Sequence, residues 1–244
     1  MTGITLNQSF GATNLGVSTT ITEQILALPN LLHWFRADEN VELAAGKIAS
    51  IIDKAGTNLT PAQANTNLQP LLSENVFGQY PAISFDSADD RLVSVATVNA
   101  EGPFTLALIM KCNNADGGTQ AAVSIRTDAT NQVFVGFNAN TVQFQTGNTK
   151  STAPYANGET IVVLASVNGT SRKFRVNGVR VADGVMSAGA GATAPLILGS
   201  LVDTSTGAFG GSLQSVLFFN DDVIENVDAL AAIEGLARKL GAAV

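Results

Sequence analysis

The sequence predicts an all-β fold, and its 244 residues are enough for one large β-sandwich. Between residues 161 and 219, polar and apolar side chains alternate, as in strands that have one buried face and one solvent-exposed face. Asn168-Gly169 and Asn177-Gly178 interrupt this stretch, and such pairs favour the positive φ angles of tight hairpin turns. Hydrophobic residues make up 45% of the chain and charged residues only 14%, which is sufficient for a sizeable core.

The same signals place the strands in order along the chain. Runs of β-branched, aromatic or alternating residues, bounded by turn residues, predict strands at 103–111, 121–126, 132–137, 141–145, 161–167, 173–176, 179–181, 195–200 and 209–219. The polar segments 57–70 and 146–158 are expected to be loops. At the C-terminus, apolar residues recur at helical spacing, which predicts the only substantial helix, over residues 224–240.

The N-terminal residues 2–22 combine a polar background with isolated apolar side chains. We expect an extended arm that anchors the domain to a neighbouring copy or to another particle protein, and the alternative is a disordered terminus. The anchoring candidates are its apolar residues, Ile4, Leu6, Phe10, Leu15, Val17 and Ile21. One helical turn is expected over 22–28, stopped by Pro29. The expected organisation is therefore an arm at 1–30 and a β domain at 31–244.

Several segments resemble a known family, the laminin-G-like, concanavalin A-like jelly roll. They are the aromatic-rich strand 31–38 that ends in Ala-Asp, the strand 47–52 before an Asp-x-x-Gly turn, the segment Pro81-Ala-Ile-Ser-Phe-Asp, and the run from Ile161 to Asn220 that ends in Phe-Gly-Gly-Ser-Leu-Gln-Ser-Val-Leu-Phe-Phe-Asn. The resemblance covers residues 31–241. It implies two packed antiparallel sheets closed by a short terminal helix, and often a carbohydrate-binding or adhesion role. Domains of this kind are also found in bacteriophage virion proteins.

Two aromatic residues are candidates for stacking on a sugar, Trp34 in the first strand and Tyr155 in the 146–158 loop. The competing interpretation of Trp34 is a core anchor, since tryptophan buries a large apolar area. The only histidine, His33, is expected to be structural, because no cluster of cysteines and histidines accompanies it.

Asp86, Asp89 and Asp90 form an acidic cluster that resembles a set of metal ligands. Carboxylate oxygens are ligands that Ca²⁺ prefers, so a calcium site is one interpretation. The favoured interpretation is that Asp86 and Asp89 make side-chain-to-backbone turns, because the spacing is not that of an EF-hand loop. We therefore expect no cofactor, with calcium as the alternative.

Charge and composition exclude several classes of partner. The net charge of −7 argues against nucleic acid and against an anionic membrane surface. The single cysteine, Cys112, cannot form an internal disulfide and is expected to be buried. Residues 1–8 lack the basic and apolar regions of a signal peptide, so we expect synthesis in a host cytoplasm.

No catalytic motif is present in the sequence. The paired carboxylates of glycosidases are not placed by any motif, and a single histidine and a single cysteine leave other nucleophilic chemistry unsupported. We therefore expect a non-enzymatic, oligomeric structural protein of a bacteriophage virion surface, most simply a capsid decoration protein that contacts the major capsid protein. The alternative is a carbohydrate-binding adhesion module of a tail fibre or bacterial surface protein, which contacts host glycans.

Overall fold

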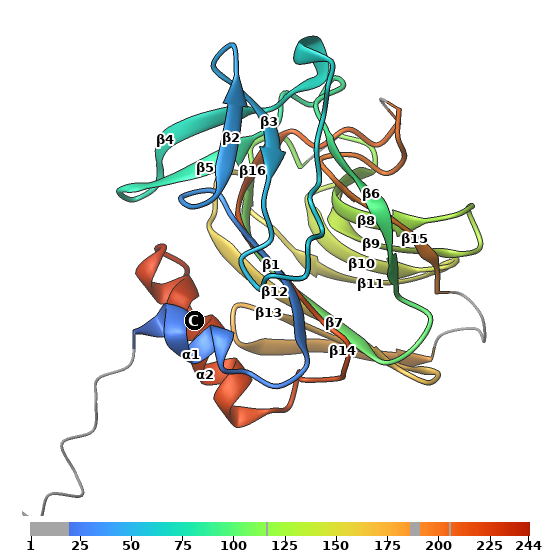
Figure 1. Ribbon diagram of the computed structural model, residues 1–244. Helices are drawn as coiled ribbons and strands as arrows, with labels where there is room; N and C mark the ends of the chain where they lie inside the picture. The colour runs from blue at the N-terminus through green and yellow to red at the C-terminus, as the bar shows by residue number, and fades with distance from the viewer. Residues whose placement is uncertain (1–19, 116, 186–190, 205) are drawn as a thin grey trace, which may run out of the picture.

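The computed structural model describes residues 20–115, 117–185, 191–204 and 206–244, and these form two antiparallel sheets packed as a jelly-roll-like sandwich (Figure 1). Two short helices lie together against the larger sheet (Figure 1). The predicted all-β sandwich with a C-terminal helix is confirmed. Among the described residues, no helix is long and apolar enough to span a membrane.

The larger sheet has ten strands, nine of them in the spatial order β14-β13-β12-β7-β16-β5-β4-β3-β2, with β1 paired to β16 beside this path. Its strands are β1 (Leu31–Arg36), β2 (Val41–Ala44), β3 (Lys47–Ile51), β4 (Leu71–Phe77), β5 (Tyr80–Ser84), β7 (Phe104–Cys112), β12 (Ile161–Asn168), β13 (Ser171–Val176), β14 (Val179–Val185) and β16 (Gly211–Phe219). A 3-10 turn, η1 (Thr66–Leu68), precedes β4.

The smaller sheet has six strands in the order β11-β10-β9-β8-β15-β6. They are β6 (Leu92–Asn99), β8 (Gln120–Arg126), β9 (Gln132–Asn138), β10 (Thr141–Thr146), β11 (Thr149–Pro154) and β15 (Thr193–Leu198). The segment 146–158, which was expected to be a loop, therefore contains a strand. Small side chains explain the difference, because Ser151 and Ala153 point inward on β11 without giving a strongly apolar pattern.

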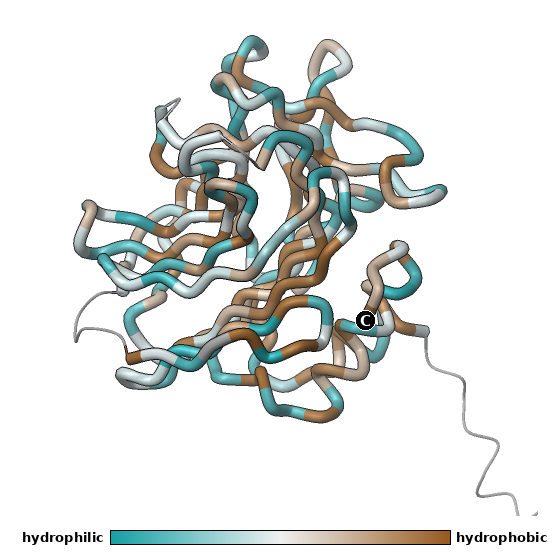
Figure 2. Tube along the Cα trace, turned by 180° about the vertical axis from the view of Figure 1, so that it is seen from behind, coloured by the Kyte–Doolittle hydropathy of each residue, from teal (hydrophilic) through white to brown (hydrophobic). Residues whose placement is uncertain are grey.

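The central strands of the larger sheet are buried on both faces. Along β7, Leu106, Leu108 and Met110 belong to the core between the sheets, whereas Ala107 and Ile109 belong to a second core beneath the helices. This division follows from the two-residue period of a strand, which sends successive side chains to opposite faces. Figure 2 shows the hydrophobic residues concentrated along these central strands.

Two helices form the second core with the outer face of the sheet. The first is α1 (Ile21–Leu26), where Thr20 and Glu23 form a capping box. The second is α2 (Val227–Lys239), which buries Ala232, Ile233 and Leu236 among other residues. It begins three residues later than expected because the side chain of Asn226 caps its N-terminus.

The position of Ile21 corrects part of the expected arm. Ile21 begins α1 and packs against the second core, so it belongs to the globular domain rather than to an extended arm. The other anchoring candidates, Ile4, Leu6, Phe10, Leu15 and Val17, lie outside the described residues, and their role stays a prediction.

Candidate functional site

Trp34 is a core residue and not an exposed platform. Its side chain is fully buried in the second core, and its Nε1 donates a hydrogen bond to Ser215 Oγ at 2.8 Å. The Arg36 guanidinium and the Lys54 ammonium lie 5.2 and 5.7 Å from the ring centroid. A ring covered in this way cannot stack on a sugar, so the structure contradicts that role for Trp34 and agrees with the core-anchor interpretation.

Tyr155 is buried as well. Its hydroxyl accepts a hydrogen bond from the Cys112 backbone N–H at 2.7 Å and lies 2.9 Å from the carbonyl oxygens of Cys112 and Glu159. Its ring packs against Phe137 with 4.6 Å between centroids, and burial raises the pKa of Tyr155 to about 12. Tyr155 therefore fixes the 154–159 segment to the end of β7, and it is not available for sugar stacking.

The acidic cluster forms a hydrogen-bonded turn. The carboxylate of Asp86 accepts hydrogen bonds from the backbone N–H groups of Ala88 at 2.8 Å and Asp89 at 3.3 Å, while Asp90 Oδ2 accepts one from Asp86 N–H at 3.2 Å. Burial tends to raise the pKa of Asp86, but these amide donors outweigh it and lower the pKa. This geometry is the side-chain-to-backbone turn that the sequence favoured for Asp86. The sequence favoured the same role for Asp89, but the carboxylate that closes the turn is that of Asp90.

The same cluster offers little to a cation. Oxygen atoms of Asp86, Asp89 and Asp90 lie within 4.8 Å of one another, which fits the donor chemistry of Ca²⁺. However, the backbone amides already engage Asp86 Oδ1 and Asp90 Oδ2, and calcium needs six to eight oxygen ligands. The buried Asp90 Oδ1 has no hydrogen-bond partner among the described residues, and burial together with the charge of Asp86 raises the pKa of Asp90 to about 6.

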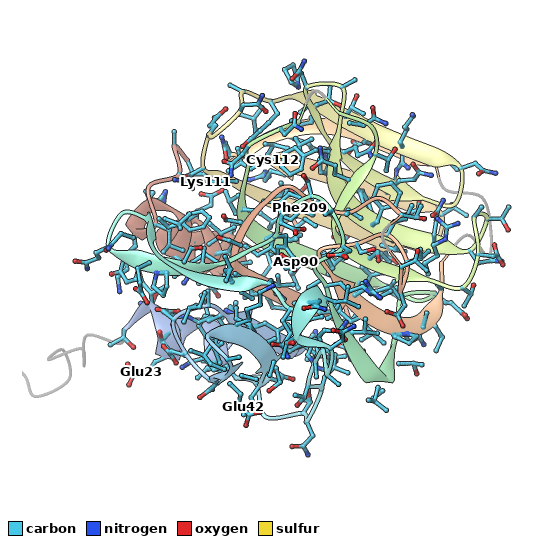
Figure 3. All side chains as sticks on the ribbon, turned by 90° about the horizontal axis from the view of Figure 1, so that it is seen from above. Glu23, Glu42, Asp90, Lys111, Cys112 and Phe209 are labelled. Carbon is cyan, nitrogen blue, oxygen red and sulfur yellow. The ribbon has the colours of Figure 1, made fainter. Side chains whose placement is uncertain are left out.

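Beside this turn lies a polar pocket of about 310 Å³, built by three loops at one end of the sandwich. It is lined by Ser87, Asn114, Gly117, Gly118, Thr119, Gln120, Gly207 and Ala208. We call it the loop-end pocket. Figure 3 shows Asp90, Phe209 and Cys112 near one another at this end of the molecule.

Hydrogen bonds from backbone N–H groups hold the three loops of the loop-end pocket together. Ser87 N–H donates to the Phe209 carbonyl at 3.1 Å, and Gln120 Oε1 accepts from Gly210 N–H at 2.8 Å. Glycine is required at 210, because a Cβ there would lie 2.7 Å from the Cβ of Ser87. Gly210 therefore permits the close approach of its loop to that of Ser87, and the hydrogen bonds between the loops keep the pocket preformed.

The lining of the loop-end pocket is polar but neutral. Ser87 and Thr119 bring hydroxyl groups, Asn114 brings an exposed amide, and Gly117 and Gly118 expose their backbone. The Thr119 hydroxyl is oriented by a hydrogen bond of 2.9 Å from Asn138 Nδ2. Such a set of hydroxyl, amide and backbone groups can donate and accept hydrogen bonds without any charge.

A family model covers this chain from residue 85 to residue 224, which is more than half of its length, and describes the concanavalin A-like lectin/glucanases superfamily. The chain belongs to this superfamily. The predicted laminin-G-like, concanavalin A-like resemblance is thereby confirmed. No curated protein sequence matches the chain.

Solved structures show the same fold at low sequence identity. The botulinum neurotoxin serotype D binding domain matches with a TM-score of 0.61 and 10% identity, over 85% of this chain and 51% of its own. The binding domain of Paraclostridial Mosquitocidal Protein 1 matches with a TM-score of 0.58 and 12% identity, over 83% and 52%. A Trypanosoma rangeli sialidase in complex with sialic acid matches with a TM-score of 0.62 and 8% identity, over 86% and 34%.

The concanavalin A-like domain thus spans about half the length of the two binding domains and about a third of the sialidase. Its loop-end pocket was not predicted from the sequence. Residues 113–120 lie between two predicted strands, and the pocket joins residues of this segment to Ser87 and Gly207, which are distant in the chain. The only available signal was the density of Gly, Asn, Ser and Thr in each of these loops.

Proposed function

We propose that this concanavalin A-like domain is a non-enzymatic carbohydrate-binding module and that the loop-end pocket holds the sugar. The observation that supports it is the neutral hydrogen-bonding lining of a preformed pocket of about 310 Å³, large enough for a sugar ring. Sugar hydroxyls both donate and accept hydrogen bonds, as do Ser87, Asn114 and Thr119.

The charges around the pocket favour a neutral sugar over an acidic one. Its lining residues include no lysine or arginine, and Asp86, Asp89 and Asp90 lie in the turn beside it. The net charge of −7 acts in the same direction. A carboxylated sugar such as sialic acid would approach these aspartates without a cationic partner in the pocket, and like charges in proximity repel.

A second proposal concerns where the module is displayed, on the exterior of a bacteriophage particle. Helix α1, which the N-terminal segment precedes, lies beside α2 at the lower left of Figure 1, whereas the orange segment 199–204 lies at the upper right. A domain attached through residues 1–19 would therefore present the loop-end pocket away from its attachment. This arrangement suits a decoration protein that is anchored to a capsid protein and contacts host glycans.

A glycan array with matched variants tests the carbohydrate proposal. Wild-type protein is expected to retain neutral glycans, and Asn114→Ala is expected to weaken retention about tenfold, as the loss of roughly 1.4 kcal/mol implies. Asn168→Ala, an exposed asparagine at the end of β12, is the matched control and should bind like wild type. Failure to retain any glycan, or equal retention by Asn114→Ala, would refute the proposal.

Particle stoichiometry tests the location. Many copies on a purified head are expected for a decoration protein, detected by quantitative mass spectrometry of intact particles. A few copies at a tail tip would instead indicate a receptor-binding component, and absence from particles would exclude a virion role.

A further inference from the structure

A second cavity lies at the other end of β7 and shares no lining residue with the loop-end pocket. It has a volume of about 360 Å³ and is lined by Leu32, His33, Thr97, Val98, Asn99, Gly102, Pro103 and Asn220. We call it the His33 cavity. Gly102 and Pro103 precede β7 and Asn114 follows it, so nine residues of strand, about 30 Å, separate the two sites.

His33 is held in one orientation by a buried carboxylate. Its Nδ1 lies 2.8 Å from Asp53 Oδ2, and the Asp53 side chain is completely buried. Burial tends to raise the pKa of Asp53, but hydrogen bonds from His33, Thr57 and the backbone of Trp34 and Ala55 outweigh it and lower the pKa. The ionised carboxylate therefore accepts a hydrogen bond from Nδ1–H, which holds the imidazole ring in place.

Because Nδ1 is engaged by Asp53, a ligand could form a hydrogen bond with the imidazole only at Nε2. No hydrogen bond to Nε2 is formed by the described residues, 12% of the His33 side chain is exposed, and His33 lines the cavity. Thr57 Oγ1 lies 2.6 Å from the same Nδ1, so the threonine and the aspartate share one nitrogen. A nucleophile–histidine–carboxylate relay needs them on opposite nitrogens, and the geometry therefore fits binding rather than proton transfer to a nucleophile.

The other polar groups of the His33 cavity complement Nε2. Asn99 Oδ1 accepts a hydrogen bond from Glu101 N–H at 2.9 Å, which leaves the Asn99 Nδ2 protons for a ligand. The exposed Asn220 brings a second amide from the end of β16. Leu32, Val98 and Pro103 supply apolar surface, so the cavity combines an imidazole nitrogen, two amides and a hydrophobic wall.

We propose that the His33 cavity is a second binding site for a neutral, hydroxyl-rich ligand of monosaccharide size. A ligand hydroxyl forms a hydrogen bond with Nε2, the amides of Asn99 and Asn220 contact neighbouring hydroxyls, and the C–H face of the ring lies on the apolar wall. The lining includes no lysine or arginine that would favour an acid. This inference rests on the proposed carbohydrate function and adds a second point of contact for a branched or extended glycan.

The single histidine makes the site directly observable. In a long-range ¹H–¹⁵N spectrum of the full chain, the imidazole signals belong to His33 alone. The probes are methyl α-glucoside, methyl α-galactoside and methyl α-mannoside, added separately at constant neutral pH. We expect a saturable shift of Nε2 with at least one of them, and about tenfold weaker binding in Asn220→Ala.

The variants separate this proposal from that for the loop-end pocket. Asn114→Ala should leave the His33 response unchanged, and Asn168→Ala should behave like wild type. No Nε2 shift with any of the three sugars, or equal affinity in Asn220→Ala, overturns the His33 site. A His33 response that persists when the array shows no loss in Asn114→Ala would refute the loop-end pocket alone.

Discussion

Replacing Asp90 by asparagine should stabilise the protein at neutral pH. Asp90 is only 4% exposed, its Oδ1 has no hydrogen-bond partner among the described residues, and burial with the nearby charge of Asp86 raises its pKa to about 6. A rise from the ordinary value of 3.8 corresponds to roughly 3 kcal/mol of unfavourable interaction with the ionised form. Because the introduced side-chain amide also needs a hydrogen-bond partner, we expect Asp90→Asn to gain less than this, about 1–2 kcal/mol at pH 7.

The sign of the pH dependence follows from the same shift. A folded-state pKa above the unfolded value means that this contribution to stability is complete below about pH 4 and is lost as the pH rises through about 6. Wild-type unfolding free energy should therefore fall between about pH 4 and pH 7, and that of Asp90→Asn should stay flatter. The pKa values of Asp53, Asp86 and Asp222 are lowered in the folded protein, so these groups stabilise it when they are ionised. Their contribution to the unfolding free energy is lost as the pH falls, at values below about 4.

Urea denaturation across this pH range measures the effect. Asp89→Asn is the matched control, because it changes the same charge in the same turn at a half-buried position. Equal pH slopes for wild type and Asp90→Asn, or a destabilised variant at pH 7, would refute the argument. Adding calcium at pH 7 tests whether these carboxylates bind the ion. If they do, calcium should raise the melting temperature of wild type but not that of Asp90→Asn.

Three further predictions concern packing and assembly. Trp34→Ala should cost about 3–5 kcal/mol in urea denaturation, as for other large-to-small changes in a core, and a wild-type midpoint would disprove its burial. Gly199→Ala should cost at least about 1–3 kcal/mol, because its Cβ would lie 2.2 Å from the Phe85 ring at a φ of +87°; a neutral result would show that Phe85 moves freely. Deletion of residues 2–19 should leave the melting temperature unchanged while abolishing attachment to the particle, and retained attachment would exclude the arm as the anchor.

The sequence predicts those parts of the fold that depend on neighbouring residues. Asn177 and Gly178 adopt φ values of +47° and +74°, and the β13–β14 hairpin forms at the expected place. Strand β11 was missed because its inward residues are small and its outward residues polar, so that its pairing with β10 is decided by the partner strand.

The sites depend on contacts between distant residues and were for that reason not predicted. Asp53 lies twenty positions after His33, and neither residue alone signals the pair. Trp34 and Tyr155 were chosen as sugar platforms for their residue type, but exposure is decided by what packs over them. Trp34 is buried in the second core, which the two helices help to form. The residues next to Trp34 in the sequence do not indicate this burial.

The two-sided burial of β7 bears on how this domain can be cut or transplanted. The region that matches the superfamily, residues 85–224, omits β1 and both helices. A fragment with those limits would carry Ala107, Ile109 and Leu217 on an uncovered face, and β16 would lose its pairing with β1. Such a fragment is expected to aggregate, so the smallest portable unit extends from Thr20 through α2.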